Sequence, residues 1–314
     1  MQQMDFSVVS DGKPETLEAY ARILETLRER VAPDAESTGP PHWILRRARQ
    51  LHRFLREKAP ATREHYYTVL SLGIQTLGPV SSAMKDDLDK RLKKLKALNM
   101  ARARGGQKSE RVSKNWISWA EVEGVRDRLE KEVRSLHPRR KLTPEELYTY
   151  QKYVLLSLYT MQPPVRDDYA TMRVTPVNSA EFKADGYNHL LVGPGRRLRF
   201  HFSEYKTSKI YGSLETEPPS DLAAVLHSWL PKIRHRGDGG RLLAKRDGGP
   251  MQEGTPKDIL NALFQEATGK RGIGPAMLRR IYMTGRFGKE QEERLRVAKK
   301  MMHSVSMGNR YIKR

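Results

Sequence analysis

The chain has 314 residues, enough for two domains, and its 58 Lys and Arg side chains against 37 Asp and Glu give a formal net charge of +21 at pH 7. It has no cysteine, which excludes disulfides, thiolate nucleophiles and cysteine-based zinc sites. We find no apolar run of about 18 residues and no signal-peptide pattern at the start, and therefore expect an intracellular protein without a membrane span. The charge favours nucleic acid as partner, with RNA of the ribosomal type and an anionic membrane surface as alternatives.

The first hundred residues are expected to form four helices. Apolar residues recur at three- and four-residue spacing in each of the segments 14–31, 40–58, 61–77 and 81–98. The remaining helix faces are rich in Lys and Arg, with Arg46, Arg53 and Lys93 as candidate DNA contacts. Four basic helices predict a DNA-binding clamp, and an ordinary solvated surface is the alternative for each helix.

A basic segment separates these helices from the rest of the chain. Residues 99–114 are rich in Arg, Lys, Gly and Ser, which predicts a linker that lies along a DNA backbone, with Arg102 and Arg104 as contacts. The sequence therefore predicts a helical domain over 1–100, a linker over 101–114 and a second domain over 115–314.

The second domain is expected to be mostly helical with one small antiparallel sheet. Ser118 with Glu121, and Thr143 with Glu146, have the spacing of capping boxes that begin two helices. The segments 189–192 and 198–202 predict two strands, and residues 206–212 predict a turn that enters a short third strand. Further helices are expected over 217–233, 255–269, 275–285 and 289–302.

Five residues of this domain supply the groups needed to break a phosphodiester covalently. Two arginines, Arg166 and Arg279, can neutralise the charge that gathers on the non-bridging oxygens. Tyr311 can attack phosphorus, Lys206 can protonate the departing 5′ oxygen, and His303 can hydrogen-bond a non-bridging oxygen or help to remove the tyrosine proton. Lys209 lies on the same turn as Lys206 and is its competitor for the acid role.

The order and context of these residues resemble the tyrosine recombinase (phage-integrase-like) family over most of the chain. "SLYTMQPPVRDDY" is similar to the first-arginine box T-G-x-R-x-x-E, and "KTSKIYG" to the K-T-x-K hairpin. "PAMLRRIY" is similar to the box P-H-x-L-R-H, and "MMHSVSMGNRY" to L-G-H-S followed by the nucleophile. These motifs are most similar to those of recombinases from large DNA viruses and related mobile elements.

The resemblance implies a fold and an activity. The expected fold is a helical core-binding domain followed by a mixed, mostly helical catalytic domain. Arg166, Lys206, Arg279, His303 and Tyr311 match the family's catalytic positions. The implied activity is site-specific DNA integration or recombination through a 3′-phosphotyrosyl intermediate. It is expected to act on double-stranded DNA as a homotetramer on two sites, with no metal or other cofactor, in a bacterial cytoplasm, a host nucleus or a viral factory.

The sequence also departs from the family's pattern. Ala276 and Arg280 occupy the two histidine positions of the third box, and Arg280 is a further candidate DNA contact. Tyr169 stands where the family has an acidic residue, and Asp167 or Asp168 is expected to take its role. Three residues follow Tyr311, fewer than in many members, which dock a longer tail on a neighbouring subunit.

Two alternatives stay open at this point. A type IB topoisomerase or a hairpin telomere resolvase would use the same chemistry with a different outcome. A recombinase-derived protein that binds DNA without cutting it would explain the altered third box.

Overall fold

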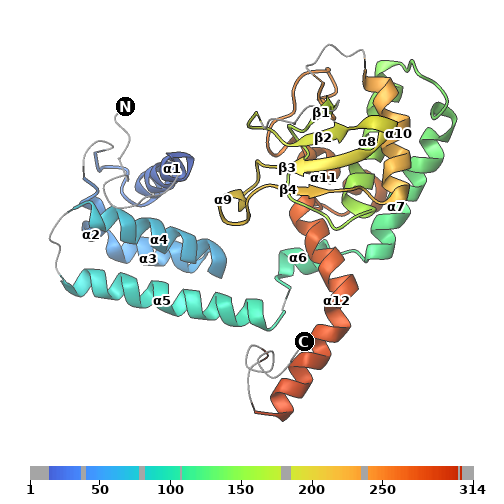
Figure 1. Ribbon diagram of the computed structural model, residues 1–314. Coiled ribbons are helices and arrows are strands. Elements are labelled where there is room, and N and C mark those ends of the chain that lie inside the picture. Colours follow the sequence, from blue (N-terminus) through green and yellow to red (C-terminus); the bar gives the residue numbers. More distant parts are fainter. Residues whose placement is uncertain are drawn as a thin grey trace. The chain divides into compact units, whose positions relative to one another are not determined.

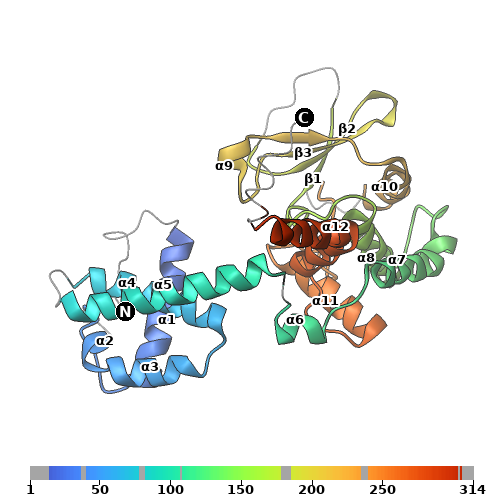
Figure 2. The same cartoon turned by 90° about the horizontal axis from the view of Figure 1, so that it is seen from below.

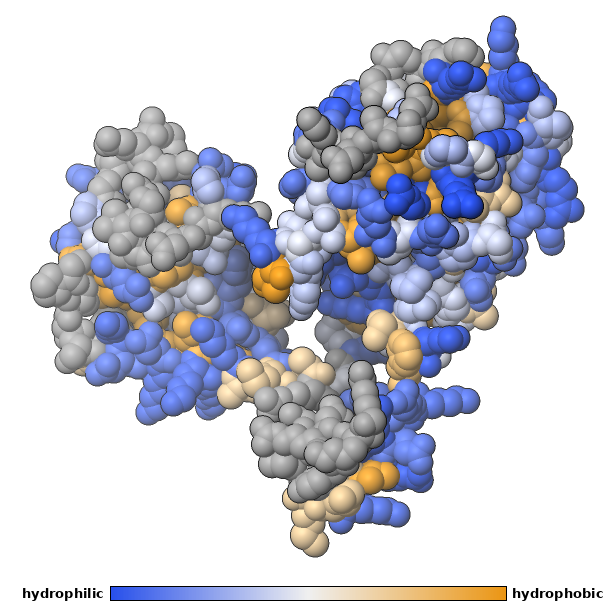
Figure 3. Space-filling view, in the orientation of Figure 1, coloured by the Kyte–Doolittle hydropathy of each residue, from blue (hydrophilic) through white to orange (hydrophobic). Residues whose placement is uncertain are grey.

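The computed structural model describes residues 14–36, 40–77, 82–106, 108–177, 185–234 and 240–302, together with Val305. Within these ranges the protein is mainly helical and has a small mixed sheet of four strands. The chain folds into two compact units, Met1–Lys108 and Ser109–Arg314. Hydrophilic side chains make up most of the surface in view in each unit (Figure 3). None of the described helices has the length and apolar character needed to cross a bilayer.

The first unit packs its helices around one apolar core. Its elements are α1 (Pro14–Val31), α2 (Trp43–Arg46), α3 (Ala48–Arg56), α4 (Pro60–Gln75) and α5 (Ser82–Arg104). The core contains Leu24, Leu27, Leu51, Leu55 and Leu70, which come from the apolar stripes of α1, α3 and α4. The predicted helices are therefore present, with the second one divided at Arg47 into α2 and α3.

The segment that we expected to be a linker is partly helical. Helix α5 continues to Arg104 because residues 99–104 include Met, Ala and Arg, which favour helix, and it stops before Gly106, whose φ is +65°. A short helix α6 (Glu110–Lys114) follows, capped by the side chain of Ser109. Arg102 is exposed near the end of α5, and Arg104 is its last residue.

The second unit contains the helices α7 (Trp119–Val133), α8 (Pro144–Thr160), α10 (Ser220–Ile233), α11 (Thr255–Thr268) and α12 (Pro275–Lys300), with the 3₁₀ turn η1 (Arg134–Leu136) after α7. Both predicted capping boxes are confirmed: the side chain at each N-cap accepts from the backbone of the glutamate, whose carboxylate accepts from the N-cap backbone. Helix α8 is buried along its last three turns and forms the centre of the core.

Helix α12 is one continuous helix, where the sequence predicted two. Two glycines, Gly285 and Gly288, made the interval look like a break, but neither is accompanied by proline or adopts a positive φ. A Cβ at Gly285 would lie 3.4 Å from Trp119 Cβ, so the small residue permits close packing of α12 on the start of α7.

The sheet has the order β1-β2-β3-β4, formed by Arg173–Pro176, His189–Val192, Leu198–Phe202 and Leu214–Thr216. The expectation of a purely antiparallel sheet is wrong, because β1 pairs parallel to β2 while the other pairs are antiparallel. Strand β1 has four residues and ends in a proline, so its alternation of polar and apolar residues is too brief to predict a strand. Figure 2 shows α7, α8, α11 and α12 on one side of this sheet.

The turn between β3 and β4 carries a short helix, α9 (Ser208–Tyr211), which projects from the sheet (Figure 1). The alternating side chains of Leu198, Phe200 and Phe202 point from β3 into the core. The strand is thereby fixed on the helical layer, and it carries the turn with Lys206 at its end.

Candidate active site

Arg166 lies in the loop that follows α8. Two prolines, Pro163 and Pro164, end the helix, and the Tyr159 hydroxyl donates a hydrogen bond to the Arg166 carbonyl oxygen. The Arg166 backbone N–H donates to Asp168 Oδ2 at 3.1 Å. The backbone at this position is therefore held from both sides while the Arg166 side chain is exposed.

Arg279 lies in the second turn of α12. Its charge and that of Arg166 both act on the Asp168 carboxyl. Burial raises the pKa of Asp168, while the backbone N–H and charge of Arg166 and the charge of Arg279 partly oppose that rise. Two predicted phosphate ligands, more than a hundred residues apart in sequence, thus lie within electrostatic reach of one carboxyl.

Lys206 is exposed in the turn between β3 and α9. The Tyr205 hydroxyl donates to the Gly212 carbonyl at 2.7 Å, and Gly212 adopts φ +70°, which lets the chain reverse into β4. Lys209 is also exposed, within α9 itself. Beside these two lysines, Ile210 and Tyr211 are 76% and 75% exposed, an unusual pair of large apolar side chains at a surface.

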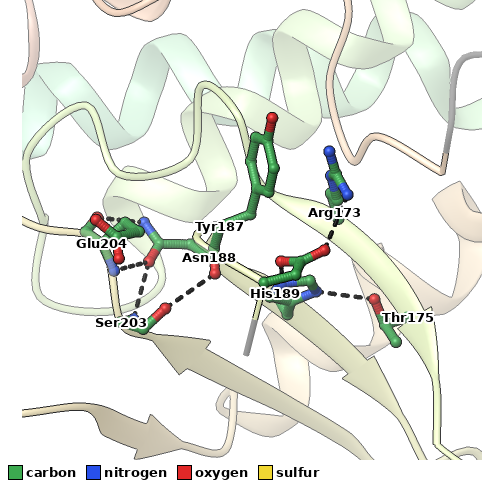
Figure 4. A network of polar contacts seen from close by, with 8 residues as sticks. Arg173, Thr175, Tyr187, Asn188, His189, Ser203 and Glu204 are labelled. Atoms are coloured by element: carbon green, nitrogen blue, oxygen red, sulfur yellow. Dashed lines mark hydrogen bonds and ion pairs between the residues drawn. The ribbon is translucent and has the colours of Figure 1, made fainter. Parts of the chain in front are cut away.

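The buried side chain of Asn188 joins the Arg166 loop to the segment that leads to Lys206. Figure 4 shows its contacts with Ser203 and Glu204 of that segment. Its Nδ2 donates to the carbonyl oxygens of Asp168, at 3.0 Å, and Glu204, at 2.8 Å. Its Oδ1 accepts from the backbone N–H groups of Ser203 and Glu204, at 3.0 and 2.9 Å. Asn188 is 2% exposed, so these four bonds are made in a low-dielectric interior and fix the two segments against each other.

Sequence reasoning missed Asn188. It precedes the strand β2, and a single asparagine before a strand ordinarily indicates a turn. Its role depends on backbone groups of residues 168, 203 and 204, which only the folded chain brings together. One signal was available in the sequence. Asn188 is a polar residue directly before a predicted strand, and that strand lies between the segments of Arg166 and Lys206.

The two other predicted catalytic residues, His303 and Tyr311, lie outside the described residues. Helix α12 ends at Lys300, three positions before His303. Asn188 joins the segments of Arg166 and Lys206, and the charge of Arg279 acts on the first of them. The catalytic roles of all five residues stay predictions.

The residues that differ from the recombinase boxes have different surroundings in the structure. Tyr169 is fully buried, with its ring packed on Tyr159, Phe200 and Phe202, so it belongs to the core. Its neighbour Asp168 is the acid near the two arginines. Ala276 is exposed one helical turn before Arg279, on the same face of α12, and its methyl group supplies no hydrogen bond there.

The predicted DNA contacts are distributed over both units. Arg46, Arg53, Lys93 and Arg102 are exposed in the first unit, while Lys209 and Arg280 are exposed in the second. Of the first four, Arg53 lines a cavity that also contains basic residues not selected from the sequence: Arg49, Arg56, Arg63, Arg91 and Lys94. Their spacing of three, four and seven residues along α3 and α5 was the signal for a shared face.

A second polar network lies on the sheet. The His189 ring shares hydrogen bonds with the Thr175 hydroxyl and with Asp185, both at 2.8 Å, and Arg173 pairs with Asp185 at 2.9 Å (Figure 4). This order is that of a hydroxyl, imidazole and carboxylate relay. The cavity along this sheet is lined by Val174, Pro176 and Val192, which point to the opposite face from Thr175 and His189, so we assign the network to pairing of β1 with β2.

Within the described ranges, no group of three or more His, Asp or Glu side chains is arranged to hold a metal ion. The charged groups of the candidate site are instead two arginines, one lysine and two aspartates.

Comparison with protein-family models and with curated proteins finds no match to this chain. The resemblance to tyrosine recombinases therefore depends on the four sequence boxes.

We predict that Asn188→Asp destabilises the protein by about 2–4 kcal/mol, because the carbonyl oxygens of Asp168 and Glu204 lose a donor and face a buried charge. Urea denaturation measures the change. The control is Asn115→Asp, whose amide is half exposed and can exchange its partners for water. A loss below about 1 kcal/mol would contradict the assigned role of Asn188.

We also predict that Asp167→Asn stabilises the protein at pH 7. Burial and the neighbouring charge of Asp168 raise the pKa of Asp167, Glu253 and Asp258 add to the rise, and Lys257 opposes it. One carboxylate oxygen is buried without a hydrogen bond in the described structure.

The sign of the pH effect follows from this upward shift. Above its folded pKa the Asp167 charge disfavours the native state, and below the ordinary value of 3.8 both states are protonated and the penalty is gone. The gain from Asp167→Asn should therefore shrink as pH falls through the folded pKa. Thermal unfolding from pH 7 to pH 3 tests this, with exposed Glu266→Gln as control; a gain that grows toward acid pH refutes it.

Proposed function

We propose that the protein is a DNA strand-breaking and rejoining enzyme of the tyrosine recombinase kind, acting in site-specific recombination or integration. The observation that carries the proposal is that Asn188 joins the loop of Arg166 to the segment of Lys206, while the charges of Arg166 and Arg279 both act on the Asp168 carboxyl of that loop. Two guanidinium groups whose charges act on one carboxyl, in a region joined to an exposed lysine turn, suit a phosphodiester whose charge increases during attack.

The cleavage step uses Tyr311 as nucleophile. Its hydroxyl oxygen bonds to phosphorus, the hydroxyl proton passes to His303 or to water, and the bond from phosphorus to the 5′ oxygen breaks. Lys206 gives a proton to that departing oxygen, so a free 5′ hydroxyl and a 3′-phosphotyrosyl link result. Attack by a 5′ hydroxyl of a partner strand reverses each transfer and joins new ends. Throughout, Arg166 and Arg279 neutralise the non-bridging oxygens, with His303 as a further hydrogen-bond donor.

Duplex DNA is the proposed partner, and both basic units of each chain contact it. Four copies of the chain assemble on two DNA sites, in a bacterial cytoplasm, a host nucleus or a viral factory. The exposed Ile210 and Tyr211 on α9 would then meet the DNA beside Lys206 and Lys209, where apolar side chains pack on sugars or bases.

One observation favours a second candidate with the same chemistry. Ala276 occupies the exposed position one turn before Arg279 and supplies no hydrogen bond to a phosphate. A type IB topoisomerase-like enzyme is therefore the second candidate, and relaxation of supercoiled plasmid without a recognition site would select it. Binding of DNA without cleavage under any condition would select a recombinase-derived binding protein.

A suicide substrate, nicked near the cleavage point within the genetic element that encodes the protein, tests the nucleophile. Wild type should form a covalent protein–DNA adduct because the short 5′ fragment diffuses away before rejoining. Tyr311→Phe should form none, while Tyr66→Phe in the first unit should behave as wild type. An equal adduct from Tyr311→Phe, or none from wild type, would contradict the proposal.

A substrate with sulfur in place of the bridging 5′ oxygen tests the acid. Lys206→Ala should slow cleavage of ordinary DNA by about 10²–10⁴-fold, because the alkoxide leaves without a proton. The sulfur substrate should restore cleavage, since a thiolate leaves unprotonated at neutral pH. Lys209→Ala is the matched control. If Lys209→Ala alone shows this loss and rescue, Lys209 is the acid and our assignment is wrong.

A further inference from the structure

A basic cavity of about 690 Å³ lies within the first unit, between α3, α4 and α5. Its lining consists mainly of cations and includes two leucines: Arg49, His52, Arg53, Arg56, Arg63, Tyr67, Arg91, Lys94, Leu95 and Leu98. This volume is within the range of small-molecule sites and is large enough for several phosphate groups.

Helical spacing explains why these residues share one face. On α3 the lining positions are 49, 52, 53 and 56, and on α5 they are 91, 94, 95 and 98, both with steps of three, four and seven residues. On α4, Arg63 and Tyr67 are one turn apart. The alternate face of α3 carries Leu51 and Leu55 into the core, so core packing itself turns the arginines toward the cavity.

A hydrogen-bonded network fixes one side of the cavity. The His52 ring shares hydrogen bonds with the Tyr67 hydroxyl, at 2.9 Å, and lies 3.2 Å from Asp87 Oδ2. Arg91 Nε donates to the same Asp87 oxygen at 2.8 Å. Asp87 thus orients His52 and Arg91, and its single charge offsets only one of the cavity's cations.

The other cations of the cavity are not neutralised within the described structure. There, Arg49, Arg53, Arg56 and Lys94 form no ion pair, and the buried Nε of Arg63 has no hydrogen-bond acceptor. Glu64, next to Arg63, accepts from Asn99 at 2.6 Å. So many unopposed positive charges around one space repel one another, and an anion in that space would remove the repulsion.

We propose that this cavity is a binding site for phosphate groups, in which the guanidinium groups of α3 and α5 contact phosphate oxygens. The phosphates belong either to consecutive nucleotides of a nucleic-acid strand or to a free nucleoside polyphosphate. Arginine forks match phosphate oxygens bidentately, and the ordered side with His52 and Arg91 reduces the entropy lost on binding. Binding of a nucleic-acid strand in the cavity rests on the proposed function, whereas binding of a free nucleotide does not.

The variants compare equal changes of charge inside and outside the cavity. Arg53→Ala/Lys94→Ala removes two lining cations, and Arg30→Ala/Lys96→Ala removes two exposed cations that do not line it. Lys96 lies on the same helix as Lys94 but on another face. All are made in the full chain carrying Tyr311→Phe, so that binding is measured without cleavage.

Two probes distinguish the sources. Duplex DNA is titrated by fluorescence anisotropy from 50 to 200 mM salt, and ATP is titrated by calorimetry and by the shift in melting temperature. If strand phosphates occupy the cavity, the lining variant weakens DNA binding about tenfold and lowers the salt slope by about 0.9 for each lost contact, and the control variant does neither. If a free nucleotide occupies it, ATP raises the melting temperature of the parent and control variant but not of the lining variant.

The proposal is overturned if the lining and control variants weaken DNA binding equally and ATP binds to neither or to both alike. Unchanged melting temperatures of the ligand-free variants show that both are folded, as expected for exposed side chains without partners in the described structure. Failure of wild type to form a DNA adduct would contradict the proposed function and leave this result standing.

Discussion

The candidate site depends on one buried amide, that of Asn188. Four backbone groups from two separate loops are its partners, and in the interior each would lose a hydrogen bond if the amide were absent. One loop carries Arg166 and the other leads to Lys206. Asn188 directly precedes β2. The neighbouring strand β3 is fixed on the helical layer by Phe200 and Phe202. The core therefore determines where the backbone of these two loops lies.

Positive charge is used differently in the two units. In the second unit, the charges of Arg166 and Arg279 both act on one partly buried carboxyl, that of Asp168. In the first unit, arginines gather because the apolar face of α3 is buried and its other face must carry them. Both arrangements leave exposed cations beside ordered polar groups. Phosphate is the ligand that we propose for both, and a net charge of +21 favours a polyanionic partner.

Local signals predicted much of the fold. The capping boxes at Ser118 and Thr143, the strands β2 and β3 and the helices of the first unit follow from short-range spacing. Strand β1 and its parallel pairing could not be predicted, because the alternation of its four residues is too brief to indicate a strand and its partner lies 16 positions along the chain. The continuous α12 was missed because the packing of Gly285 on Trp119 is tertiary. At the site, residue types and order indicated Arg166, Lys206 and Arg279, whereas Asn188 acts through backbone groups that no motif records.

The most direct test of the account is a crystal structure of the protein with a cleaved DNA substrate and orthovanadate, which adopts the five-coordinate geometry of phosphoryl transfer. We predict vanadium bonded to Tyr311, its equatorial oxygens within hydrogen-bond distance of Arg166 and Arg279, and Lys206 beside the 5′ oxygen. The Asn188 hydrogen bonds should be unchanged. Vanadate bound away from these arginines, or bonded to another side chain, would contradict the account.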